Sequence, residues 1–312
     1  MDRITFSVEP VAPFRLDLTV WALRRRAENI IDSWDGSTYR RVLIAQEQPV
    51  EVEVFQTGPS DMPLLSITVI GTRLSSDTQP LVTSVLTRML GINADLSEFY
   101  RFAERQPKLD VLARQFRGVK PPRFPTLFET LVNAMACQQL SLNVGILLLN
   151  RLIAAFGPSG PEEGALVHAF PTPENLASFD IDALTPLGFS RQKARAIIEL
   201  ASAISEKQLN LDELENLDSE VACEQLRKLR GVGRWSAEYV LLRGLGRLHV
   251  FPGDDVGARN RLQNWLDLAE PLDYEGVQHF IAPWRPYGGF IYFHLLLKGL
   301  TEAGFLNVKG ER

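Results

Sequence analysis

The spacing of hydrophobic residues changes character near residue 118. Before that point, apolar and polar residues alternate in three segments, at 39–44, 50–55 and 64–70. Alternation with a period of two predicts β-strands, and turn residues at 57–60 separate the last two strands. Helical spacing is present at 16–27 and 81–90. Residues 1–117 are therefore predicted to form an antiparallel sheet with flanking helices.

The segment 118–125, rich in proline and glycine, interrupts regular structure and predicts a boundary. From residue 127 onward the pattern is helical almost throughout, with loops at 157–161 and 170–173. The predicted fold class is α+β. An N-terminal subdomain covers 1–117, and a mostly α-helical region covers 118–312.

Two glycines mark the sharpest turn in the helical region. Leu229 ends one apolar helical pattern and Trp235 begins the next, so Gly231 and Gly233 must reverse the chain in very few residues. Such a hairpin, predicted near residues 226–244, exposes backbone N–H groups at the start of its second helix, where a phosphate can bind. The hydroxyl of Ser236 could add a donor. An ordinary short helix–helix connection remains an alternative.

Basic residues concentrate around this hairpin. Between residues 227 and 261 lie eight basic residues and three acidic ones, a local balance of +5 in a chain whose formal net charge is −5. An acidic chain with a basic window predicts contact with DNA through one localised footprint. The basic residues are Arg227, Lys228, Arg230, Arg234, Arg243, Arg247, Arg259 and Arg261.

Two adjacent carboxylates follow the hairpin. Asp254 and Asp255 come after a Pro-Gly turn and before a predicted helix over 256–266. Helix capping explains one of them. The second is repelled by the first and needs another reason, which a cationic reaction partner would supply. That both merely cap the helix is the alternative.

Taken together, these motifs resemble the helix-hairpin-helix DNA glycosylases, and in particular their alkylbase-removing branch. The resemblance rests on L-x-G-V-G at 229–233, P-x-D-D at 252–255 and an aromatic-rich segment at 287–294. The segments 128–141 and 187–194 are similar to two further family signatures. This resemblance implies two helical lobes around a cleft, in which a damaged purine is flipped out of duplex DNA and its N-glycosidic bond is hydrolysed.

The resemblance also implies roles for single residues. Asp255 matches the catalytic aspartate, and Asp254 matches its helix-capping neighbour. Residues that match or could form the walls of a base pocket are Trp235, Tyr239, Phe293 and, in the first helix, Trp21. An aromatic pair four residues apart, such as Trp235 and Tyr239, shares one helix face and can equally belong to a core.

DNA contacts are implied for Gly231, Gly233, Arg234 and Ser236 at the hairpin. Gln138 and Gln139 match the segment that enters the minor groove, with Gln139 at the position of the wedge that fills the gap left by the flipped base. Plain helix-cap or surface glutamines are the alternative interpretation.

The position two residues after Gly233 distinguishes two mechanisms. Relatives that also cleave the DNA backbone carry a lysine there, whereas this chain has Trp235. The resemblance thus implies a monofunctional enzyme without lyase activity and without a required cofactor. It further implies a monovalent cation, Na⁺ or K⁺, on the backbone carbonyls of Arg227, Leu229 and Val232.

Composition sets the remaining expectations. The longest apolar runs fall short of the roughly 20 residues of a membrane span, and the N-terminus lacks the order of a signal peptide, so a cytoplasmic protein, nucleoid-associated in a bacterium, is expected. Two cysteines are too few for a four-cysteine iron–sulfur cluster. We expect a monomer that binds double-stranded DNA containing damaged bases. The alternatives are a non-catalytic hairpin-bearing repair protein and, with four scattered histidines, a metalloenzyme.

Overall fold

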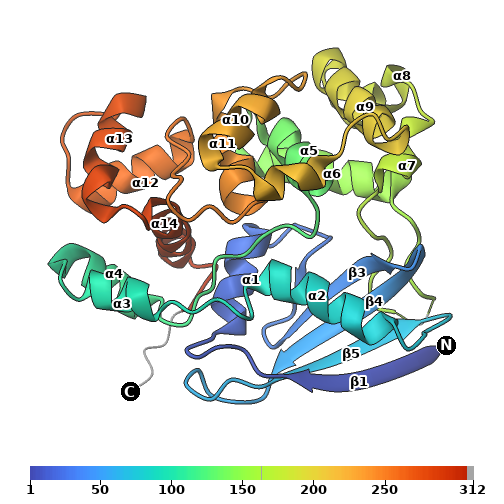
Figure 1. Ribbon diagram of the computed structural model, residues 1–312, viewed down its shortest axis with the longest axis horizontal. Helices are drawn as coiled ribbons and strands as arrows, with labels where there is room; N and C mark the ends of the chain where they lie inside the picture. The colour runs from blue at the N-terminus through green and yellow to red at the C-terminus, as the bar shows by residue number, and fades with distance from the viewer. Residues whose placement is uncertain (163, 308–312) are drawn as a thin grey trace.

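The computed structural model describes residues 1–162 and 164–307, and it combines one antiparallel sheet with a large helical region (Figure 1). The sheet has the order β1-β5-β4-β3-β2, and all of its pairings are antiparallel. Its strands are β1 (Asp2–Val8), β2 (Ser33–Trp34), β3 (Thr38–Ala45), β4 (Gln48–Gln56) and β5 (Leu65–Gly71). The predicted α+β class is confirmed.

Two helices pack on the sheet through their apolar faces. These are α1 (Leu16–Arg24) and α2 (Thr78–Leu90), and their buried side chains share a core with Val52, Ile67 and Val69 of the strands. The first helix is shorter than the predicted 16–27, because Arg25 adopts a left-handed φ of 63° and ends it.

The next two helices pack elsewhere. α3 (Ser97–Ala103) and α4 (Pro107–Gln115) share a second core with α12 (Val256–Leu266), α13 (Tyr274–Ile281) and α14 (Gly288–Glu302). Figure 1 shows α3 and α4 beside α14, away from the sheet. The boundary predicted at residue 117 therefore falls between helices that pack together, because α3 and α4 precede it and α12–α14 follow it. The division of the chain into two domains at this residue stays a prediction.

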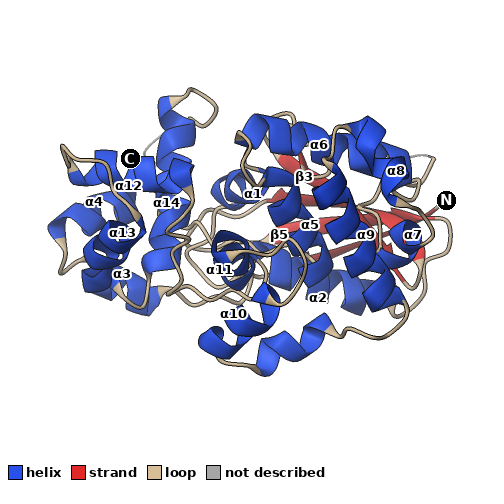
Figure 2. Cartoon of the chain, turned by 90° about the horizontal axis from the view of Figure 1, so that it is seen from above, coloured by secondary structure: helices blue, strands red, loops and turns tan. Residues whose placement is uncertain are grey.

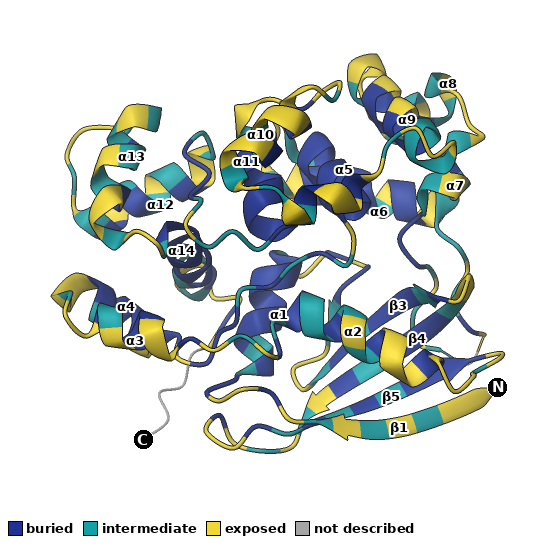
Figure 3. Cartoon of the chain, viewed as in Figure 1, coloured by how far each residue is buried: buried dark blue, intermediate teal, exposed yellow. Residues whose placement is uncertain are grey.

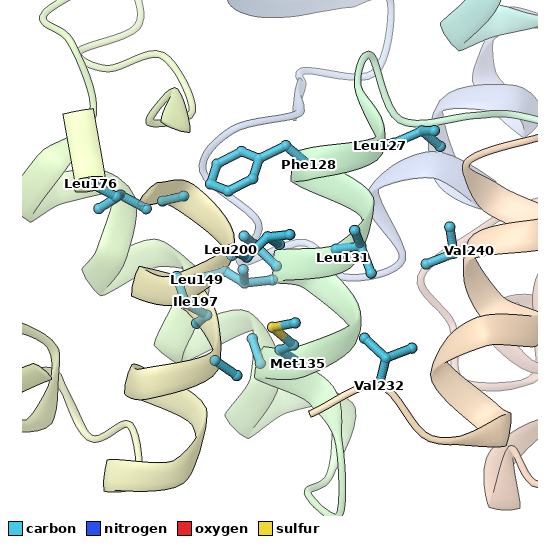
Figure 4. Packing of buried hydrophobic residues seen from close by; sticks show 14 of the residues in the cluster. Leu127, Phe128, Leu131, Met135, Leu149, Leu176, Ile197, Leu200, Val232 and Val240 are labelled. Carbon is cyan, nitrogen blue, oxygen red and sulfur yellow. The ribbon is translucent and has the colours of Figure 1, made fainter. Parts of the chain in front are cut away.

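The other helical lobe has its own core (Figure 4). Its elements are α5 (Leu127–Cys137), α6 (Leu142–Phe156), α7 (Pro173–Ala177), α8 (Ile181–Leu184), α9 (Arg191–Ser205), α10 (Ser219–Arg227) and α11 (Arg234–Arg243). The 3₁₀ helices Thr185–Leu187 and Leu211–Asn216 also belong to this lobe, whereas the 3₁₀ helix Ala282–Trp284 lies between α13 and α14. Leu131 and Met135 of α5 sit at the centre, between Ile197 of α9 and Val240 of α11.

Seen from above, α10 and α11 lie between the α12–α14 group and the α5–α9 group (Figure 2). Buried residues fill the facing sides of these helices, and exposed residues lie on their outer surfaces (Figure 3).

A buried ion cluster fastens the sheet to the helical region. Arg41 of β3 contacts Asp32 at 2.7 Å and Glu129 of α5 at 2.5 Å, and the Tyr39 hydroxyl also donates to Asp32. Burial raises the pKa of Glu129, although the neighbouring Arg41 lowers it. Removing either partner would strand a buried charge, so this contact fixes how α5 sits on the sheet.

Candidate active site

The predicted hairpin joins α10 to α11, and its two glycines have different reasons to be glycine. Gly231 has a φ of +79°, and a Cβ there would lie 2.9 Å from the Cβ of Ala196. Gly233 has a φ of −90° and a ψ of −174°, and a Cβ there would meet no atom within 4 Å. Gly231 is thus required by the turn itself. Gly233 leaves the N-terminus of α11 facing open space, as a phosphate contact would need.

Asp255 is both a helix cap and a wall of a cleft. Its Oδ1 accepts a hydrogen bond from the Ala258 N–H at 2.8 Å, which makes it the N-cap of α12. Its Oδ2 faces the Trp235 indole N–H at 3.4 Å and the Tyr292 hydroxyl at 3.3 Å. One carboxylate oxygen therefore holds the backbone, while the other is presented between two aromatic side chains.

Asp254 has a different partner. Its carboxylate forms an ion pair with the Arg234 guanidinium, with contacts of 2.7 and 3.1 Å. The expectation that Asp254 caps the helix is wrong, because Asp255 fills that role. The charge of Asp254 is explained by Arg234, which also stacks 3.6 Å from the centre of the Tyr274 ring.

The cleft beside Asp255 has a volume of about 940 Å³ and is walled by segments that are distant in sequence. They are the end of α1, the α5–α6 loop, the start of α11, the turn before α12, and α14. The ring centres of Trp235 and Tyr239 lie 5.4 Å apart at an interplanar angle of 33°, and both residues line the cleft. A volume of this size accommodates one planar base.

Two of the expected pocket residues lie elsewhere. Phe293 is fully buried, with its ring 5.3 Å from the Arg243 guanidinium, and Trp21 packs against Phe305; neither lines the cleft. The residues of α14 that line it are Tyr292 and Leu296. Every residue from 288 to 297 is buried, so periodicity could not tell which side of this helix faces the cleft.

Sequence reasoning also missed Arg25. This arginine lines the cleft, and its guanidinium donates to the Tyr239 hydroxyl at 2.8 Å and to Asn133 Oδ1 at 2.7 Å. Burial raises the pKa of Tyr239, although Arg25 lowers it. Three consecutive arginines at 24–26, at the end of a predicted helix, were the only signal in the sequence.

The α5–α6 loop is tied to the hairpin by a glutamine. The Gln138 amide donates to the Gly231 carbonyl at 2.6 Å and to the Ser236 hydroxyl at 2.5 Å. Ser236 is 1% exposed and its hydroxyl accepts from Gln138, so contact between this hydroxyl and a phosphate stays a prediction. Gln139, by contrast, is exposed at the loop tip with a left-handed φ of 55°, next to the exposed Leu140.

Only some of the basic residues between 227 and 261 are available at the surface. Arg243 is fully buried and donates to the carbonyls of Ala22 and Leu23. Arg247 donates to two backbone carbonyls of the segment 215–217, and Arg230 pairs with Glu199. Part of the local positive charge therefore serves packing instead of a DNA footprint.

The carbonyls of Arg227, Leu229 and Val232 belong to the hairpin turn. That of Leu229 accepts the Val232 N–H at 3.1 Å, which leaves one lone pair for another partner. Within the described residues, no group of three or more His, Cys, Asp or Glu side chains is arranged to hold a metal ion. None of the helices described is long and apolar enough to cross a membrane.

Comparison with known proteins agrees with this geometry. Residues 132–286 match the model of the HhH-GPD superfamily of base excision DNA repair proteins. The chain belongs to this superfamily. The matched range contains the hairpin, the Asp254–Asp255 turn and the α5–α6 loop.

Individual relatives of this HhH-GPD protein extend the match. The 3-methyladenine DNA-glycosylase of Archaeoglobus fulgidus superposes with a TM-score of 0.83 at 27% identity, over 95% of this chain and 98% of that one. A DNA-3-methyladenine glycosylase of Bacillus subtilis is 29% identical over 65% of this chain and 67% of its own length. A Mycobacterium tuberculosis protein described as a probable bifunctional transcriptional activator/DNA repair enzyme AlkA is 32% identical over 68% of this chain but only 42% of its own length.

Proposed function

We propose that this protein is a DNA glycosylase of base excision repair that flips alkylated purines such as 3-methyladenine out of duplex DNA and hydrolyses their N-glycosidic bond. The observation that carries the proposal is Asp255, whose Oδ2 lies in the cleft between Trp235 and Tyr292. The names of the relatives in Archaeoglobus fulgidus and Bacillus subtilis point to the same chemistry.

The chemistry follows from the charge of the reaction. As the bond from C1′ of the sugar to the base breaks, positive charge develops on the sugar, and a carboxylate nearby stabilises it. Alkylation at a ring nitrogen already makes the base a good leaving group, so little acid catalysis is needed. Asp255 would stabilise the sugar cation and accept a proton from the attacking water, while Trp235 and Tyr239 hold the electron-poor base.

Base release from methylated duplex DNA tests the proposal. We expect the wild-type protein to release methylpurines without an added cofactor, and Asp255→Asn to reduce release by about a hundredfold to ten-thousandfold. Because asparagine caps helices as well as aspartate does, this variant should keep its fold and its DNA binding. Asp254→Asn is the matched control. Near-normal turnover of Asp255→Asn together with loss in Asp254→Asn would reverse the assignment.

We further propose that the enzyme is monofunctional. Among the described residues, those that line the cleft include no lysine, and Lys193 is engaged by the carbonyls of Ala136 and Gln138. Abasic product should therefore accumulate without strand breaks, and borohydride should trap no protein–DNA adduct. A trapped adduct would contradict this mechanism and direct attention to Lys193 or Lys228.

For DNA contact we propose the amide groups at Gly231 and Gly233, the side chains of Arg234 and Gln139, and a monovalent cation on the carbonyls of Arg227, Leu229 and Val232. When bound, that cation would supply a positive charge at the hairpin that attracts a phosphate. We also propose that the protein acts as a cytoplasmic monomer.

A non-catalytic DNA-binding role is the competing function. The carboxylate of Asp255 inside the cleft favours the enzyme.

A further inference from the structure

A buried arginine lies at the inner end of the cleft. Arg25 is 3% exposed, lines the cleft and lies directly at the end of α1. Its guanidinium contacts neutral groups, namely the Tyr239 hydroxyl at 2.8 Å, Asn133 Oδ1 at 2.7 Å and Cys137 Sγ at 4.0 Å. A buried arginine is normally paired with a carboxylate, so this environment is unusual.

The charge of Arg25 is not neutralised by the part of the chain that the structure describes. Over residues 1–162 and 164–307, no carboxylate forms an ion pair with it, and its buried Nε has no hydrogen-bond partner. Burial opposes the charge, but the neighbouring Tyr239 and Cys137 hold the net pKa of Arg25 above its usual range. Each terminal nitrogen of a guanidinium carries two N–H groups, and Nη2 of Arg25 uses one of them for Asn133, so its second N–H is available to a ligand.

The other charges of the cleft do not compensate. Asp254 is paired with Arg234, which leaves Asp255 as the cleft-lining carboxylate without an arginine partner. Arg26 and Arg261 also line the cleft, but they are only partly buried and lie where DNA phosphates can reach them. Arg25 is buried and donates to Tyr239, so among these arginines it is the one that contacts an aromatic wall of the cleft.

We infer that Arg25 determines which bases this protein excises. Its guanidinium donates a hydrogen bond to an acceptor on the edge of a flipped purine, and this bond matters most for a neutral purine, which leaves as an anion. The inference rests on the proposed glycosylase activity. It predicts that excision of neutral, carbonyl-bearing damaged purines depends on Arg25, whereas excision of the cationic methylpurines proposed above does not.

The reaction step explains why such a donor accelerates release. Water adds to C1′ of the sugar and gives its proton to Asp255 while the bond from C1′ to N9 breaks, and the electron pair of that bond goes to the base. A neutral purine leaves as an anion, which then takes a proton from solvent. The donor at Arg25 stabilises this developing negative charge, whereas a cationic methylpurine leaves as a neutral base and gains nothing from it.

Two duplexes separate these cases, one containing hypoxanthine, which is neutral, and one containing 7-methylguanine, which is cationic in DNA. We expect Arg25→Gln to lower kcat/KM for hypoxanthine about 10- to 100-fold, the usual effect of losing a charged hydrogen bond, and to leave 7-methylguanine release unchanged. Arg26→Gln, the adjacent arginine, is the matched control and should lower both by the same factor.

Arg25→Lys is a second, more conservative variant in case Arg25→Gln does not fold. Circular dichroism establishes whether each variant is folded. Arg25→Lys keeps the charge, so it should retain more activity on hypoxanthine than Arg25→Gln does and the same activity on 7-methylguanine. An equal reduction of both substrates in folded Arg25→Gln would overturn the inference and leave the glycosylase activity standing. A wild-type protein that releases neither base would instead refute the proposed function.

Discussion

The two hairpin glycines allow DNA binding and stability to be changed separately. Alanine at Gly231 must adopt a φ of +79° and places its Cβ 2.9 Å from the Cβ of the buried Ala196. The left-handed conformation costs roughly 1–2 kcal/mol for a residue with a Cβ, and crowding in a packed core adds about 1–3 kcal/mol. We therefore expect Gly231→Ala to lower the free energy of unfolding by about 2–5 kcal/mol.

Alanine at Gly233 meets neither problem. Its φ of −90° and ψ of −174° are open to any residue, and no atom lies within 4 Å of the added Cβ. The free energy of unfolding should change by less than about 0.5 kcal/mol. The added methyl group would, however, stand where a phosphate approaches the amides of α11. Loss of charge-assisted hydrogen bonds there should weaken DNA binding about 10- to 100-fold.

Urea denaturation followed by tryptophan fluorescence measures the first effect, and fluorescence anisotropy with damaged and undamaged duplexes measures the second. Gly233→Ala should weaken binding to both duplexes equally, because phosphate contacts position the protein without reading the base. A Gly233→Ala protein that binds both duplexes normally would show that the hairpin is only a structural turn. A Gly231→Ala protein as stable as wild type would refute the strain argument.

Three further predictions follow from charged and titratable groups. Burial lowers the pKa of His294 to about 4 from the usual 6.5, so between these pH values the unfolded state binds the proton more readily than the folded state. The free energy of unfolding should therefore fall by about 2 kcal/mol from pH 7 to pH 5. Urea midpoints that change equally across this range in His294→Phe would contradict this prediction. Asp254→Asn breaks an exposed ion pair and should lower the free energy of unfolding by less than about 1 kcal/mol. It also frees Arg234, so DNA affinity in the anisotropy assay should stay equal or rise. A marked loss of affinity would mean that the ion pair positions the hairpin. Because Arg243 and Arg247 serve packing, DNA binding should release only on the order of 3–5 counterions in a salt titration, at about 0.9 per phosphate; a slope typical of ten contacts would place the DNA surface elsewhere.

Local features of the site were predictable from sequence. The helix predicted over 256–266 is α12 (Val256–Leu266), because a Pro-Gly turn and an aspartate define where it begins. The spacing of Trp235 and Tyr239 placed their rings on one face, since residues four apart on a helix are neighbours.

Long-range features were not predictable. Arg25 and Tyr239 are 214 residues apart in sequence, and no local pattern encodes their contact. Arg243 also belongs to the basic segment that was predicted to contact DNA, although it is buried against the end of α1. In α14, burial on all sides removes the polar stripe that would have distinguished Tyr292 from Phe293.

The walls of the cleft come from both ends of the chain, from Arg25 just after the first helix to Tyr292 and Leu296 in the last. During synthesis, the sheet and the helical lobe of α5–α11 can fold while α14 is still inside the ribosome, since domains fold progressively from the N-terminus. The cleft is therefore completed only after α14 has emerged. A nascent or C-terminally clipped chain would display the hairpin but lack one wall of the pocket, so such a fragment could occupy DNA without excising bases from it.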